Sequence, residues 1–138
     1  MSLYCDIETQ FKSQESLVAA LMEHGGWGKS QIEVHGEPQH LFGYKGDQRA
    51  EVAHVIIRRN SVGKASNDMG FVRQDDGTYK AIISEYDKDS KYTASWMGQL
   101  TASYAYHATK REMERRGRRV TRERLPDGRQ RVYVTNYR

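Results

Sequence analysis

The sequence contains little of what marks secreted or membrane-embedded proteins. Its 138 residues include a single cysteine, Cys5, which excludes an intramolecular disulfide and any metal site built from several cysteines. No segment approaches the roughly 20 consecutive apolar residues that a membrane-spanning helix requires. The first residues also lack the basic and apolar stretches of a signal peptide. We therefore expect a soluble, cytoplasmic protein that does not bind a membrane.

Proline, internal repeats and low-complexity segments are equally scarce. Only two prolines occur, and no run of proline, glycine or serine divides the chain as an interdomain linker would. A chain of this length can bury about two thirds of the surface that its unfolded form exposes. We therefore expect residues 1–138 to form a single domain.

Two segments have the periodicity of amphipathic helices. Residues 15–24 carry apolar side chains at helical spacing, with Ser13 before them as a candidate N-cap and Gly25-Gly26 after them. The second segment, about 92–116, is the longest element of the chain, and Gly117 closes it. The sequence therefore predicts two helices.

Most of the remaining sequence has the composition and alternation of β-strands. Asp76-Gly77 and Asp127-Gly128 each lie between two such segments, and Asp-Gly signals a hairpin because glycine accepts positive φ. Pro38 interrupts another pattern and predicts a turn between two short strands. Consecutive strands with few helices favour an α+β fold, a mainly antiparallel sheet with two helices packed on one face. The expected strands cover residues 3–11, 31–44 (two strands), 50–59, 69–73, 78–85, 119–125 and 130–137.

The net charge of +4 is distributed unevenly along the chain. Residues 110–138 contain eleven Lys and Arg against four Asp and Glu, a local net charge of +7. The first 109 residues contain eleven basic and fourteen acidic side chains, a net charge of −3. We therefore expect any attraction to an anionic partner to act at the C-terminal end.

This basic end supplies the candidate binding residues. Arginine side chains bind phosphates bidentately and tyrosines stack on bases, a combination that suits nucleic acid. The same residues suit a protein interface, and basic residues at a helix C-terminus or on an edge strand are favourable without any ligand. The candidates are Tyr106, Arg111, Arg115, Arg118, Arg119, Arg122, Arg124, Tyr133 and Tyr137.

A second candidate site combines Tyr104 with His107, which lie about one turn apart on the longer predicted helix. A tuned imidazole titrates near neutral pH, so this pair could transfer protons in a pocket beside the sheet. Alternatively, both side chains form the edge of a core and have satisfied hydrogen bonds. We favour the structural interpretation. The helical period places Tyr106 on the other side of this helix, facing outward.

Other polar residues receive structural interpretations. The histidines lack the spacing of a helical metal-binding motif, and Asp75-Asp76 starts a turn. Acidic residues at 85–89 suit the start of a helix. Gly26–Ser30 resembles a phosphate-binding loop only superficially, because it follows a helix and not a strand. We expect neither a metal nor a cofactor. The five histidines are His24, His35, His40, His54 and His107.

Four stretches of the chain resemble a family of short proteins encoded in cyanobacteria, plastids and some phages. They are Gly43-Tyr44 leading into Ala50-Glu51-Val52, Asp68-Met69-Gly70-Phe71, Gly77-Thr78-Tyr79, and Gln99-Leu100-Thr101 through Tyr104-Ala105-Tyr106-His107. The family is the hypothetical chloroplast reading frame thirty-five family, also described as domain of unknown function twelve-fifty-seven. The resemblance implies the layout above and an intracellular setting, the cytoplasm or a compartment such as the plastid stroma. It implies no reaction, cofactor or catalytic residue.

Function is therefore inferred from the residues themselves. We expect a non-enzymatic interaction or assembly module whose partner is another protein or a second copy of the chain. Nucleic-acid binding through the C-terminal arginines is the first alternative. A small ligand-binding domain or enzyme that uses Tyr104 and His107 is the second.

Overall fold

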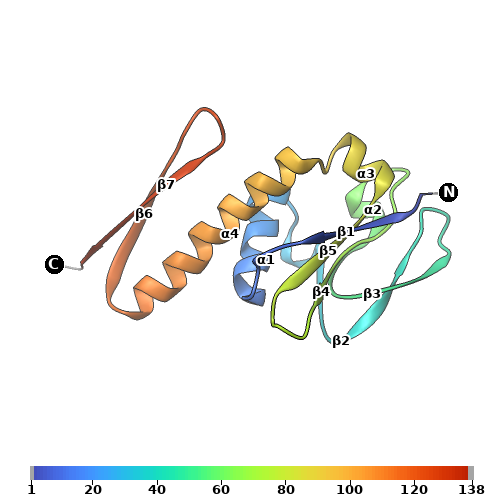
Figure 1. Ribbon diagram of the computed structural model, residues 1–138, viewed down its shortest axis with the longest axis horizontal. Helices are drawn as coiled ribbons and strands as arrows, with labels where there is room; N and C mark the ends of the chain where they lie inside the picture. Colours follow the sequence, from blue (N-terminus) through green and yellow to red (C-terminus); the bar gives the residue numbers. More distant parts are fainter. Residues whose placement is uncertain (1, 137–138) are drawn as a thin grey trace. The chain divides into compact units, whose positions relative to one another are not determined.

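The computed structural model describes residues 2–136 (Figure 1). The chain forms two compact units, one made of Met1–Lys12 and Trp27–Ala94, the other of Ser13–Gly26 and Ser95–Arg138. Both contain helix and antiparallel strand, so the predicted α+β class is confirmed. A single domain over 1–138 and the packing of helices on one face of the sheet stay predictions. No helix within residues 2–136 is long and apolar enough to cross a membrane.

The first unit is built on a five-stranded sheet in which every neighbouring pair is antiparallel. The strand order is β1-β5-β4-β3-β2, so β3 lies in the interior of the sheet. Its fully buried residues come mainly from β3, β4 and β5, where β-branched and aromatic side chains are concentrated. The strands are β1 (Tyr4–Glu8), β2 (Ile32–Phe42), β3 (Gln48–Ile57), β4 (Met69–Arg73) and β5 (Tyr79–Ser84).

Strand β2 differs from its prediction. The structure has one continuous strand over Ile32–Phe42 instead of two strands joined by a turn. Its pairing with β3 is interrupted between Val34 and Gln39, where four residues of β2 lie against a single residue of β3. Pro38 lies within this bulge on an edge strand, a position at which a residue without an N–H is tolerated.

Three short helical segments of the first unit were not predicted. The segment η1 (Lys29–Gln31) precedes β2, and α2 (Arg59–Val62) lies between β3 and β4, where the sequence predicts no helix. The third, α3 (Glu85–Ser90), begins at Ser84, whose hydroxyl oxygen accepts a hydrogen bond from the Asp87 N–H. The acidic residues at 85–89 therefore do belong to a helix start.

The segment between β3 and β4 is fastened by the carboxylate of Asp68, which is 1% exposed. One oxygen accepts hydrogen bonds from the Phe42 N–H at 2.7 Å and the Arg58 guanidinium at 2.8 Å. The other accepts the Arg59 N–H at 2.7 Å. A buried carboxylate needs such partners, so Asp68 acts as an internal support of this segment.

The second unit contains α1 (Gln14–Gly25), most of α4 (Ala94–Arg115) and a hairpin of β6 (Arg118–Arg124) and β7 (Gln130–Asn136). Both helices and the hairpin confirm their predictions to within about two residues. Ser13 caps α1 by accepting a hydrogen bond from the Ser16 N–H at 3.1 Å. Gly26, at φ 75°, ends that helix in the left-handed region where glycine has no steric penalty.

Candidate functional site

The polar centre of the second unit is the carboxylate of Glu23, on α1. It accepts hydrogen bonds from two N–H groups of the Arg122 guanidinium, one of them at 2.7 Å. It also accepts from the Ser103 hydroxyl at 2.9 Å. Arg124 Nη2 and His107 Nε2 lie 3.0 Å and 3.4 Å from its two oxygens. We call Glu23, Ser103, His107, Arg122 and Arg124 the Glu23 cluster.

The Glu23 cluster changes the titration of its members. Hydrogen bonds from Arg122 lower the pKa of Glu23 from 4.5 to about 2, against the opposing effect of burial. The same ion pair raises the pKa of Arg122. Burial lowers the pKa of His107, and the neighbouring carboxylate of Glu23 only partly opposes this shift. The cluster therefore holds a permanently ionised pair beside an imidazole that favours its neutral form.

The structure corrects the expected orientation of Tyr106. Its ring is half-buried, and the Arg122 guanidinium carbon lies 3.9 Å from the ring centroid. At this distance the guanidinium covers the aromatic face as a cation–π contact. Tyr106 therefore supports the hairpin instead of facing outward to receive a partner.

Arg122 and Arg124 share one face of β6, as the period of a strand predicts. That face is directed to Glu23, and the Arg122 side chain is only 19% exposed. The opposite face of the hairpin carries Tyr133, whose hydroxyl donates to Glu123 at 3.2 Å. The predicted arginines therefore divide between an internal ion-pair cluster and an outer face, and do not form one continuous basic surface.

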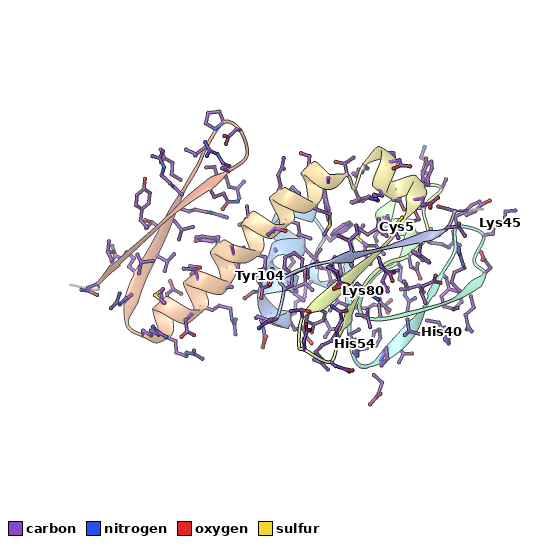
Figure 2. All side chains as sticks on the ribbon, in the orientation of Figure 1. Cys5, His40, Lys45, His54, Lys80 and Tyr104 are labelled. Atoms are coloured by element: carbon purple, nitrogen blue, oxygen red, sulfur yellow. The ribbon has the colours of Figure 1, made fainter. Side chains whose placement is uncertain are left out.

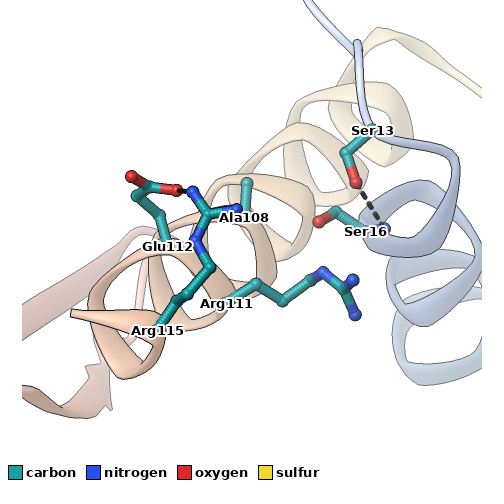
Figure 3. Close-up of a pocket in the computed structure, with 6 residues that line it drawn as sticks. All are labelled: Ser13, Ser16, Ala108, Arg111, Glu112 and Arg115. Atoms are coloured by element: carbon teal, nitrogen blue, oxygen red, sulfur yellow. Dashed lines mark hydrogen bonds and ion pairs between the residues drawn. The ribbon is translucent and has the colours of Figure 1, made fainter. Parts of the chain in front are cut away.

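The remaining basic candidates lie elsewhere in the second unit. Arg111 and Arg115 line a cavity of about 460 Å³ between α4 and the start of α1 (Figure 3). Arg118 and Arg119 are exposed at the beginning of β6. Tyr137 lies outside the described residues.

Tyr104 and His107 contact opposite ends of α1. The Tyr104 hydroxyl accepts a hydrogen bond from the Ser13 N–H at 2.9 Å, at the first turn of α1 (Figure 2). His107 contacts Glu23, near the other end of the same helix. Tyr104 is thus hydrogen-bonded, whereas His107 Nε2 is buried and, within residues 2–136, has its ion-pair contact with Glu23 but no hydrogen bond. The structural interpretation of this pair stays a prediction.

The other four histidines each have a hydrogen-bond partner. His35 Nε2 lies 2.8 Å from Glu33, which in turn binds Arg58, and His54 Nδ1 accepts the Arg73 N–H at 3.0 Å. His24 and His40 contact backbone carbonyl oxygens. The structural interpretation of the histidines stays a prediction. Residues 2–136 hold no group of three or more His, Cys, Asp or Glu side chains arranged for a metal ion.

Sequence reasoning missed three features of the second unit. The sequence did not indicate that Glu23 would be the centre of an ion-pair cluster. A single glutamate on a helix is ordinary, and its arginine partners come from the far end of the chain. Ser16 was not among the candidates, because a serine near a helix start is ordinary in sequence. Val132 and Val134 were predicted as strand residues, but their exposure, 37% and 40%, depends on what the tertiary structure leaves uncovered.

The sheet and the Glu23 cluster together define an α+β protein with an ion-paired, arginine-rich C-terminal hairpin. The chain belongs to the family described as protein of unknown function DUF1257, which matches residues 29–133. The match includes β2 to β6 and most of β7, and begins after α1. No curated protein and no solved structure matches the chain.

Proposed function

We propose that this protein is a non-enzymatic assembly module that pairs with a second copy of itself through the outer edge of β7. The observation that supports this proposal is an apolar run on that strand. Val132, Tyr133 and Val134 are 37%, 46% and 40% exposed, and β7 pairs with β6 on one side alone. A two-stranded sheet is marginally stable in water, and an exposed apolar edge strand is a template for another strand.

The two edges of the hairpin differ in charge. Strand β6 carries four arginines and one glutamate in seven residues, whereas Arg131 is the sole charged residue of β7. Charged side chains on an edge strand discourage strand addition. Pairing is therefore favoured along β7 and disfavoured along β6.

The sequence of β7 is compatible with self-pairing. An antiparallel pair of β7 strands centred on Tyr133 places Val132 opposite Val134 of the second copy and Arg131 opposite Thr135. No like charges then face each other across the interface, and the two copies use the same surface, as a two-fold symmetric dimer requires.

We also infer a reducing compartment such as the cytoplasm, because Cys5 has no cysteine partner in the chain.

The test is the molar mass of the purified protein, measured by size-exclusion chromatography with light scattering at low and high salt. We expect a dimer that persists at high salt, since apolar and backbone contacts are weakly screened. Tyr133→Lys puts two lysines opposite each other in the dimer and should yield a monomer. Thr121→Lys is the matched control, because Thr121 pairs with Tyr133 on the same face but lies on β6.

A monomeric wild-type protein, or a Tyr133→Lys variant that dimerises as strongly as Thr121→Lys, would contradict the proposal. The absorbance ratio at 260 and 280 nm is recorded in the same runs. A monomer that carries nucleic acid at low salt and loses it at high salt would favour nucleic-acid binding instead.

A further inference from the structure

The cavity between α4 and the first turn of α1 contains a buried hydroxyl without a partner. Ser16 is 1% exposed, and its Oγ has no hydrogen-bond partner within residues 2–136. Leaving a polar group buried and unsatisfied costs free energy, and such a group in a native structure calls for an explanation. Figure 3 shows the Ser16 hydroxyl turned toward α4, on the wall of the cavity of about 460 Å³.

The same cavity faces the N-terminal end of α1, a helix of twelve residues. The first N–H groups of a helix have no partner inside the helix, and the helix dipole makes this end positive. Ser13 uses its hydroxyl to cap the Ser16 N–H alone, so the N–H groups at 14 and 15 stay directed outward from the helix end. Tyr104 fixes this turn against α4 by accepting the Ser13 N–H.

Helix α4 adds two guanidinium groups to the cavity wall. Arg111 and Arg115 are four residues apart and therefore lie on the same side of α4, an arrangement that is unfavourable for like charges. Arg115 pairs with Glu112, which also binds Arg116 at 2.9 Å. Arg111 has no ion pair within residues 2–136, and Figure 3 shows it extending from α4 toward α1. Ala108, one turn earlier, leaves space beside it.

We propose that this cavity binds the phosphate group of a small phosphate monoester. The donors that converge on it are the Ser16 hydroxyl, the helix N-terminus and the guanidinium of Arg111, and all of them favour an oxyanion. Arg111, Arg115 and the helix dipole outweigh the single negative charge of Glu112, which also lines the cavity and pairs with Arg115. The remaining positive charge suits a dianion better than the single charge of a carboxylate or a phosphodiester. This site is separate from the β7 edge, so it does not depend on the proposed dimer.

The test is titration of the full chain with inorganic phosphate at a pH above its second pKa, followed by calorimetry and by amide NMR shifts of residues 14–16. We expect saturable binding and shifts that are concentrated at the start of α1. Arg111→Gln should weaken binding about tenfold or more, because it removes a charge-assisted hydrogen bond. Arg118→Gln removes the same charge from an exposed position outside the cavity, and should change affinity by less than about twofold.

Ser16→Ala separates a binding role from a structural role. Without phosphate the variant should be as stable as the wild type or more stable, because the unsatisfied hydroxyl is gone. With phosphate the wild type should show a rise in melting temperature that the variant largely loses. Glu112→Gln should act in the opposite direction and strengthen binding, because it releases Arg115 from its ion pair.

Three results would overturn the proposal. The first is the absence of shifts at residues 14–16 with millimolar inorganic phosphate. The second is equal phosphate affinity of Arg111→Gln, Ser16→Ala and Arg118→Gln. The third is equal affinity for dimethyl phosphate, a monoanionic diester, which would assign the cavity to a nucleic-acid backbone instead of a phosphate monoester.

Discussion

Arg122 on β6 and Glu23 on α1 form a bidentate ion pair although 99 residues separate them in the sequence. The pair joins the C-terminal hairpin to the first helix of the chain. The Arg122 guanidinium simultaneously covers the ring of Tyr106, so one side chain connects α1, α4 and β6. The position of the hairpin within the second unit therefore depends on this contact.

Removing one member of the pair should loosen the hairpin. We expect Glu23→Gln to lower the free energy of unfolding by about 2 kcal/mol, because Arg122 keeps its charge in a half-buried position. A cycle with Arg122→Met and the double variant should give a coupling energy of about 1–3 kcal/mol in urea unfolding. Amide hydrogen exchange in β6 and β7 should accelerate in both single variants. A coupling energy near zero would mean that the pair does not hold the hairpin.

The same carboxylate predicts a dependence of stability on pH. The pKa of Glu23 is about 2 in the folded protein and 4.5 ordinarily, so the unfolded chain binds its proton first as the pH falls. The stabilisation from this charge is complete above pH 4.5 and is lost between about pH 4.5 and pH 2. The difference in unfolding free energy between the wild type and Glu23→Gln should shrink over this interval. A difference that is constant with pH would contradict the assignment.

Asp68 should be essential for the first unit. Asp68→Ala leaves the N–H groups of Phe42 and Arg59 without their acceptor and removes an ion-pair partner of Arg58. We expect a loss of about 3–5 kcal/mol in urea unfolding. Asp75→Ala removes an exposed carboxylate from the turn between β4 and β5 and should change stability by less than about 0.5 kcal/mol. If the two variants lose similar amounts of unfolding free energy, Asp68 does not stabilise the segment between β3 and β4.

Substitution by alanine should destabilise the protein at Gly70 and stabilise it at Gly98. A Cβ at Gly70 would lie 2.5 Å from the Ala53 Cβ and 3.0 Å from Leu41, so Gly70→Ala should destabilise the sheet by about 1–3 kcal/mol. Ala53→Gly in the same chain should recover part of this loss, because it removes the closest contact. Gly98 lies in α4, where a Cβ would meet nothing within 4 Å, and Gly98→Ala should stabilise the helix by about 1 kcal/mol. Melting temperatures of the three variants test these signs.

Local patterns predicted local structure well. The Asp-Gly pairs at 76–77 and 127–128 marked the β4–β5 and β6–β7 hairpins, because the conformation of each turn depends mainly on those residues. The helix α3 was missed because its six residues are mostly polar and its cap, Ser84, ends a strand. The bulge in β2 was missed because its register is determined by β3, not by the residues around Pro38.

The candidate site was predicted less well, because it depends on contacts between distant segments. The charge count located the basic end of the chain, but it could not show that Arg122 and Arg124 bind Glu23. Helical periodicity correctly placed Tyr106 away from Tyr104, but it could not show that the hairpin covers that side. The burial of Ser16 likewise depends on the neighbouring helix, so its hydroxyl carried no signal in the sequence.

The second unit is assembled from two pieces of chain separated by roughly 70 residues. A ribosome adds roughly 5–20 residues per second, so α1 leaves it about 3–14 seconds before α4 begins to follow. During that interval Glu23 has no arginine to bind, and Tyr104 is not yet available to Ser13. The nascent chain must therefore carry α1 without its contacts to α4 and the hairpin while β2 to β5 are being synthesised, and the β6–β7 hairpin is the last element to join the unit.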